Sequence, residues 1–188
     1  IMRYTSDMLG NRVHQASMEA GERWTLNDVL GKALYSWDSR NVRTRSVYDP
    51  LRRPTGTFLR EGARAGILIG RTVYGESHPA AEAVNVRSRA IRVDDQSGEF
   101  HTADFDFRGN ILRSERRIVQ AYNSTVDWSA PPALLPETYV AATRYDAPNR
   151  PVQMTAPHSD QAGALINVLQ PLYNEANLLQ QLDGWLGQ

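Results

Sequence analysis

The sequence predicts a mainly all-β protein of antiparallel β-hairpins with at most one or two short helices. Two observations lead to this fold class. Much of the chain alternates apolar and polar residues, which is the pattern of half-buried strands. In addition, a recurring turn signal separates the strand-like stretches, with Asp in first place and most often Gly or Asn three residues later.

The turn signal is an internal repeat. Its copies begin at Asp7, Asp28, Asp49, Asp95, Asp106, Asp146 and, in degraded form, Asn174. The first three copies start 21 residues apart, and the step from Asp106 to Asp146 is 40 residues, close to two such periods. Repeats of this kind dominate the fold of a chain that carries them.

Each part of the repeat has a physical reason. The Asp side chain hydrogen-bonds the backbone two residues further on and so opens a turn. Gly or Asn in the fourth position tolerates the left-handed conformation that closes it. An aromatic residue commonly precedes the turn and places a large apolar side chain at the end of the incoming strand, as at Tyr48, Phe105, Tyr145 and Tyr173.

The turns define the expected strands. Residues 100–107 and 111–119 flank the turn at Asp106 and form one predicted hairpin, and residues 43–48 and 54–59 form another. Residues 66–74 are a candidate inner strand.

Three stretches depart from this pattern. Residues 77–84 could form a short helix capped by Ser77, although His78 precedes a proline and resists helical geometry. Residues 131–136 are rich in proline and are interpreted as a loop between hairpins, and residues 158–168 as a long turn.

Length and composition favour one domain, residues 1–188, with a possible loop boundary near 129–137. No apolar run is long enough to cross a bilayer, and no secretory leader is visible. The first residue, Ile1, suggests that the sequence begins inside a longer product. Cysteine is absent, which excludes disulfides and cysteine-based zinc sites.

The positive charge comes almost entirely from arginine, with 20 Arg against the single lysine Lys32. Residues 40–71 hold eight Arg and two acids, whereas residues 118–188 hold two Arg and six acids. One interpretation is a polyanion-binding patch. The favoured one is that the Arg side chains brace turns and strands through pairs with Asp, because they alternate with apolar residues and do not form one block.

Several phrases in the chain resemble the YD-repeat (RHS) family, and most closely the B and C subunits of bacterial insecticidal toxin complexes. The phrases occur at residues 48–54, 107–112 and 145–151, then at 7–21 with Trp24, and at 74–76, 127–129 and 173–179. The likeness covers nearly the whole chain.

The resemblance implies a function as part of a larger protein. Repeats of this family wind as a strip of antiparallel strands into a hollow shell that encloses a toxic C-terminal segment. The implied partners are the rest of the shell, its cargo, and pore-forming or B/C-type toxin subunits, with neither nucleic acid nor direct membrane insertion. The implied location is secreted or at the bacterial cell surface. No phrase matches the self-cleaving activity that some family shells carry, so the segment is expected not to be an enzyme.

The sequence predicts no catalytic, cofactor or metal residues. His101, Asp104 and Asp106 lie close together, but on a strand His101 points to the opposite face from the two acids. Asp94 and Asp95 are adjacent carboxylates where a turn is expected. Six aromatic residues could stack sugars or bases but at strand spacing are more often sheet core: Trp24, Trp37, Tyr48, Phe105, Phe107 and Trp128.

Two other functions compete with the shell. The first is a β-sheet binding module that recognises carbohydrate or another anionic cell-surface partner through residues 40–71, with Arg52 and Arg53 as the test positions. The second is a fragment of a toxin enzyme or processing protease, for which Asp95, Asp104 and Asp106 are the residues to change.

Overall fold

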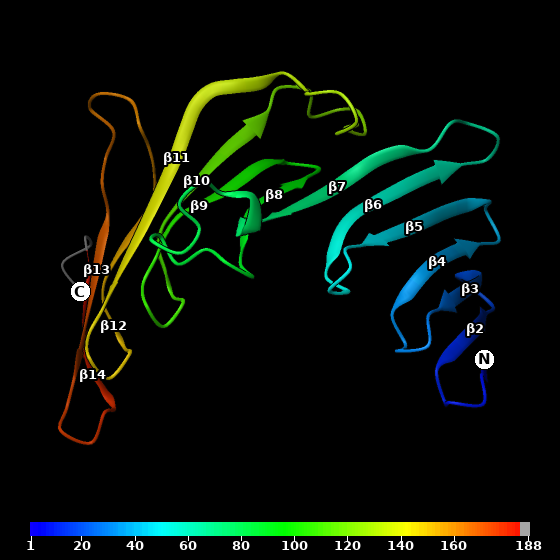
Figure 1. The fold of residues 1–188 in the computed structure, drawn as a ribbon, viewed down its shortest axis with the longest axis horizontal. Helices are drawn as coiled ribbons and strands as arrows, with labels where there is room; N and C mark the ends of the chain where they lie inside the picture. The colour runs from blue at the N-terminus through cyan, green and yellow to red at the C-terminus, as the bar shows by residue number, and fades with distance from the viewer. Residues whose placement is uncertain (185–188) are drawn as a thin grey trace. The chain divides into compact units, whose positions relative to one another are not determined.

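The computed structural model describes residues 1–184 and is all-β, which confirms the predicted fold class (Figure 1). Within these residues the regular structure consists of 14 antiparallel strands and one short 3-10 turn, Gly75–Ser77. None of the described residues belongs to a helix that is long and apolar enough to span a bilayer.

Two compact units divide the chain. The first contains residues 1–72 with 123–132, and the second contains residues 73–122 with the chain from 133 onward. The prediction of a single repeat fragment with a loop boundary near 129–137 stays a prediction.

The first unit contains strands that follow one another in the chain. They are β1 Met2–Ser6, β2 Arg12–Ser17, β3 Gly21–Asn27, β4 Ala33–Asp38, β5 Val42–Tyr48, β6 Pro54–Glu61 and β7 Ile67–Tyr74, whose last two residues belong to the second unit. Each pairs antiparallel with its chain neighbours from β1 to β7. The result is a meander, which short hairpin connections allow.

The second unit repeats this arrangement. Its strands are β8 Ala90–Asp95, β9 Gly98–Phe105, β10 Ile111–Val119, β11 Leu134–Tyr145, β12 Pro151–Ser159, β13 Val168–Tyr173 and β14 Leu179–Asp183. Again each strand pairs antiparallel with the next one along the chain. Both predicted hairpins are present, as β5–β6 and β9–β10, and the predicted strand at 66–74 is β7.

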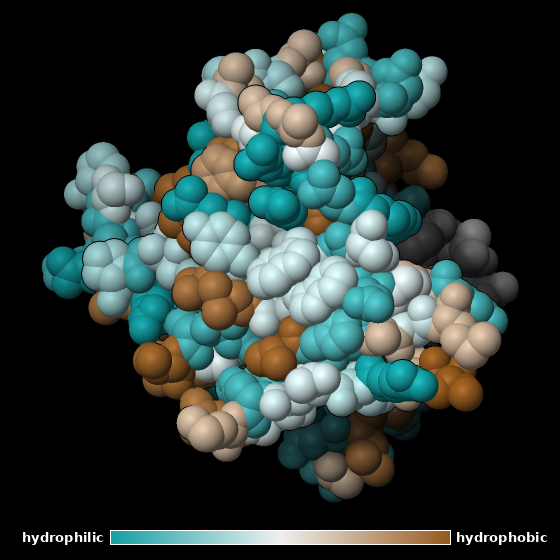
Figure 2. Space-filling view, turned by 90° about the vertical axis from the view of Figure 1, so that its right-hand side faces the viewer, coloured by the Kyte–Doolittle hydropathy of each residue, from teal (hydrophilic) through white to brown (hydrophobic). Residues whose placement is uncertain are grey.

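The buried apolar residues lie in or beside the two long connections, residues 75–89 and 120–133. They are Ala81, Val86, Val119, Val126 and Trp128. Most strand residues are half-buried or exposed, and Figure 2 shows brown apolar residues scattered among teal hydrophilic ones on the face that it presents. The core is therefore small, and the hydrogen-bonded ladders and turns carry much of the structure.

The connection 123–132 packs within the first unit along β7. The backbone N–H of Trp128 donates to the carbonyl of Leu68 at 2.8 Å, and the N–H of Leu68 donates to Asp127 Oδ1 at 3.0 Å. Trp128 is 2% exposed. It therefore belongs to the core, which is one of the two interpretations of Trp128, the other being the stacking of sugars or bases.

The prediction of a short helix at residues 77–84 is wrong. The chain makes the 3-10 turn Gly75–Ser77, and Ser77 caps no helix. His78 is extended, with φ −70° and ψ 131°, because the ring of Pro79 disfavours helical geometry in the residue before it. Residues after Pro79 form turns, with Val86 buried against Gly75.

Two loop boundaries also differ from expectation. Pro136 lies inside β11, near a register shift in the β10–β11 pairing, where a missing N–H does little harm to the ladder. The long turn expected at 158–168 is shorter, because β12 extends to Ser159 and β13 begins at Val168.

Candidate functional site

Six turns in the described chain share one hydrogen-bonding pattern. In each, the backbone N–H of the first residue donates to the carbonyl of the fifth, and the N–H of the fourth donates back to the carbonyl of the first. The side chain of the first residue also accepts the N–H of the fifth at 2.8–3.0 Å. These turns are 7–11, 28–32, 49–53, 106–110, 146–150 and 174–178.

The fourth residue of every one of these turns has a positive φ. Three are glycines with φ between 76° and 96°, namely Gly10, Gly31 and Gly109. The others are Arg52, Asn149 and Asn177, with φ of 62°, 75° and 63°. Asn tolerates this conformation, but Arg rarely adopts it.

An ion pair compensates for the conformation of Arg52. Its Nη1 lies 3.0 Å from Oδ2 of Asp28, the first residue of the preceding turn. This oxygen is buried and has no hydrogen bond of good geometry, so the guanidinium supplies its compensating charge.

The repeat turns of each unit all join strands at the same end of the hairpins. In the first unit they connect β1 to β2, β3 to β4, and β5 to β6. In the second they connect β9 to β10, β11 to β12, and β13 to β14. Because strand direction alternates, the intervening connections lie at the other end.

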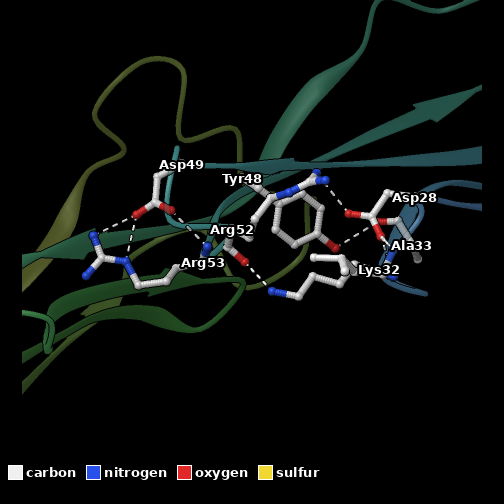
Figure 3. A network of polar contacts seen from close by, with 8 residues as sticks. Asp28, Lys32, Ala33, Tyr48, Asp49, Arg52 and Arg53 are labelled. Atoms are coloured by element: carbon white, nitrogen blue, oxygen red, sulfur yellow. Dashed lines mark hydrogen bonds and ion pairs between the residues drawn. The ribbon is translucent and has the colours of Figure 1, made fainter.

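Three pairs of consecutive turns are joined through the side chain of the fifth residue of the earlier turn. Lys32 Nζ donates to the carbonyl of Arg52 at 2.5 Å (Figure 3). Arg150 Nη1 donates to Asn177 Oδ1 at 2.7 Å, and Asn110 Nδ2 donates to Asn149 Oδ1 at 2.5 Å. In each case the acceptor belongs to the fourth residue of the next turn. We call this series of bonded turns the turn ladder.

The aromatic residue before the turn adds a second link. Tyr48 donates its hydroxyl to the carbonyl of Ala33 at 2.8 Å (Figure 3), and Tyr173 donates to the carbonyl of Pro151 at 3.1 Å. Both acceptors directly follow the preceding repeat turn. The cation of that turn also lies over the ring, Lys32 at 5.8 Å from the Tyr48 centroid and Arg150 at 4.6 Å from that of Tyr173.

Arg89 makes the same contacts from the irregular connection 75–89. Its Nη1 donates to the carbonyl of Gly109 at 3.2 Å, and its guanidinium lies 5.1 Å from the ring centroid of Phe105. Gly109 and Phe105 hold the positions that Arg52 and Tyr48 hold in their turn. No signal in the sequence predicts this role of Arg89, because no Asp turn precedes it at the repeat spacing.

A further Asp turn was missed at the other end of the strands. Asp38 Oδ1 accepts the N–H of Val42 at 3.0 Å, and Asn41 has a φ of 63°. The signal was present as Asp followed by Asn three residues later. Conversely, the predicted copy at Asp95 is a different turn, because it joins β8 to β9 at the opposite end of the hairpin from Asp106, and its Gly98 has a φ of 150°.

The turn hydrogen bonds hold the pKa of several Asp carboxyl groups below its usual value. The backbone N–H of Lys32 lowers the pKa of Asp28, and that of Arg150 lowers the pKa of Asp146. The side-chain amide of Asn11 lowers the pKa of Asp7. These carboxylates accept backbone N–H groups in their turns, and so they act as structural acceptors.

The Arg pairs fit the bracing interpretation at several positions. Arg53 pairs with Asp49 at 2.6 Å, and Arg52 pairs with Asp28. Both test residues for polyanion binding are therefore engaged within the turn ladder. Arg116 likewise pairs with Asp95, at 2.6 Å.

The adjacent acids of the sequence separate in the structure. Asp94, 1% exposed, pairs with Arg92 at 2.7 Å, and Arg92 also pairs with Glu99 on β9 at 2.7 Å. His101 contacts the same Glu99. The described residues contain no group of three or more metal-ligating side chains placed to hold an ion.

The six aromatic candidates have different environments. Trp128 is buried, and Phe107 is 84% exposed. Trp24 stacks between His14 at 5.2 Å and Trp37 at 6.3 Å. Tyr48 and Phe105 serve the turn contacts described above.

The fold is similar to that of segments of large toxin-complex chains. Crystal structures of TcdB2-TccC3-TEV and of TcdB2-TccC3 without its hypervariable C-terminal region each match with a TM-score of 0.83 and 17% identity, over 97% of this chain and 9% of theirs. The Photorhabdus luminescens Tc holotoxin pore with a TccC3 mutation matches with a TM-score of 0.84 and 18% identity, over 97% and 8%.

The chain thus spans about a tenth or less of the length of these structures. At this identity the similarity establishes the fold. No family model matches the sequence, and neither does any curated protein.

Proposed function

We propose that this chain is a structural segment of the wall of an RHS-type shell that encloses a toxin cargo in a bacterial toxin complex. The observation that carries the proposal is the turn ladder. Hydrogen bonds join turn 28–32 to turn 49–53 in the first unit, and turns 106–110, 146–150 and 174–178 in succession in the second, so that these hairpins are held in a fixed order. A wall without a thick core needs such links, because each repeat is stabilised mainly by its neighbours.

Open strand edges support the same role. Among the described strands, β1 pairs only with β2, and β14 pairs only with β13, and all residues of both edge strands are exposed. Unpaired N–H and C=O groups at an edge accept further strands. Neighbouring strands of a longer strip would cover these edges.

The fold similarity adds support at the level of the complex. The matching chains belong to Tc toxin structures, and this chain aligns with them along almost its full length. Under the proposal its partners are the remainder of the shell, the cargo, and pore-forming or B/C-type subunits. The assembly is secreted or associated with the bacterial surface.

Limited proteolysis of the full-length parent protein tests enclosure. Its C-terminal segment is followed by mass spectrometry, first under native conditions and then in urea concentrations that open the shell. The expected result is resistance in the intact protein and rapid cleavage after opening, with the isolated C-terminal segment as the unprotected control. Cleavage of that segment at once under native conditions would contradict a protective container.

The proposal gives this segment no catalytic part. Changing Asp95, Asp104 and Asp106 together to Asn in the parent protein should leave its processing unchanged. Asn retains the shape of the turn acceptor, as Asn174 does in its own turn. Processing lost in this variant, with normal melting behaviour, would favour the enzyme hypothesis.

A further inference from the structure

Three arginines form an exposed cluster on one face of the first unit. Arg43 and Arg45 lie two residues apart on β5 and therefore on the same face. Arg60 on β6 pairs in register with Arg43 and shares that face. We call Arg43, Arg45 and Arg60 the arginine patch.

The arginine patch differs from the other arginines of this region. Arg40, Arg52, Arg53 and Arg64 each pair with a carboxylate. Within residues 1–184, no carboxylate pairs with Arg43, Arg45 or Arg60. Arg43 and Arg60 lie directly opposite each other on neighbouring strands. Like charges in this position destabilise a sheet. A bound anion would remove this repulsion.

Aromatic residues border the arginine patch on both sides. Tyr35 and Trp37 on β4 pair in register with Arg45 and Arg43. On β6, Phe58 pairs with Arg45, whose guanidinium lies 5.8 Å from the ring centroid. These side chains and the arginine patch line a hollow of about 410 Å³, except for Trp37, which lines an adjoining one. The site thus combines positive charge with apolar walls.

The spacing of the arginines indicates the kind of anion that would fit. Guanidinium groups bind carboxylates through two parallel hydrogen bonds. Arg43 and Arg45 are about 6.6 Å apart along the strand, which is also the spacing of alternate side chains in an extended peptide.

We propose that the arginine patch binds an extended acidic polypeptide segment with carboxylates at alternate positions and an apolar side chain against Tyr35 or Phe58. The carboxylates meet Arg43 and Arg45, and Arg60 binds the first of them from the neighbouring strand. This site lies on the first unit and does not depend on the enclosure of a cargo.

Fluorescence anisotropy of labelled peptides tests the site on the purified chain. The probe is an eight-residue peptide that alternates Glu with Thr and Val. Its controls are a peptide of the same composition with the four Glu in one block, a Gln analogue, and a heparin oligosaccharide. The expected order is tightest binding by the alternating peptide and none by the Gln analogue, with affinity that falls as salt rises.

Two variants and one matched control assign the binding to these residues. The double variant Arg43→Gln and Arg45→Gln should weaken binding of the alternating peptide about tenfold or more. Arg60→Gln should weaken it less. It should melt no lower than the unmodified protein, because it removes the like-charge pair. Arg144→Gln changes an exposed arginine of β11 without an ion pair among the described residues, and should bind as the unmodified protein does.

Unchanged binding by the double variant would overturn the proposal. Equal or tighter binding of the blocked peptide or of heparin would overturn it as well, because the surface would then attract polyanions without recognising an extended chain. A failure of this kind leaves the proteolysis result on the parent shell untouched, so the two proposals fail independently.

Discussion

Lys32 offers a direct test of the turn ladder. It is the only lysine of the chain, and its Nζ lies 2.5 Å from the carbonyl oxygen of Arg52 in the next turn. A hydrogen bond from a charged donor contributes about 1.5–3 kcal/mol, and the lower end applies because Lys32 is half-buried. The cation–π contact with Tyr48 at 5.8 Å adds about 0.5 kcal/mol.

The variant Lys32→Met keeps the aliphatic stem and removes the charged donor. Loss of the hydrogen bond and of the ring contact together should lower the free energy of unfolding by about 2 kcal/mol. For a chain of this length the melting temperature should fall by roughly 4–8 °C. Urea denaturation and thermal melting followed by circular dichroism measure both quantities.

Two further variants make the test specific. Lys32→Arg should recover most of the loss, because Arg150 makes the equivalent bond to Asn177 at the same position of its own turn. Arg144→Met removes an exposed cation that has no ion pair among the described residues and should change stability by less than about 0.5 kcal/mol. A Lys32→Met variant as stable as Arg144→Met would refute the ladder as a stabilising feature.

Three other predictions follow from the structure. Tyr48→Phe removes the hydrogen bond from the Tyr48 hydroxyl to the Ala33 carbonyl and should lower the free energy of unfolding, measured by urea denaturation, by about 1 kcal/mol. Tyr35 is 45% exposed, and Tyr35→Phe should leave stability unchanged. Trp128→Ala should lower the free energy of unfolding by about 3–5 kcal/mol and make residues 120–133 susceptible to thermolysin, with effects much larger than those of Trp37→Ala. Equal effects of the two variants would argue against the core position of Trp128. Because the pKa of Asp28 is lowered in the folded protein, its contribution to stability is present above the unfolded-state pKa and is lost as pH falls through the folded-state pKa. The melting temperature should therefore stay level from neutral pH to about pH 5 and drop below about pH 4. A melting temperature that rises on acidification in this range would contradict that assignment.

The repeat turns could be predicted from sequence because their interactions are local. In the turn that begins at Asp106, the carboxylate accepts the N–H groups of Gly109 and Asn110, all within five residues. The residue types required at each position follow from backbone geometry alone. The alternation that flanks such turns predicted β5, β6, β9 and β10 to within two residues at each end.

The local structure could not be predicted from sequence where a residue distant in the chain determines it. Residues 77–84 carry a plausible helix signal, but the chain there forms turns that bury Val86 against Gly75. Arg89 takes part in the turn ladder only because the strands bring it to Gly109 and Phe105. Its role depends on the length of an irregular connection, for which the repeat gives no rule.

The division of the arginines shows most clearly what each level of description determines. By itself the sequence determined the fold class, the repeat turns and the concentration of Arg in residues 40–71. Only the tertiary structure decided that Arg52 is bound to Asp28, and that Arg43 and Arg60 face each other without a carboxylate partner among the described residues. The physical reason is that strand register sets which side chains meet, and register depends on hydrogen bonds between residues far apart in the chain.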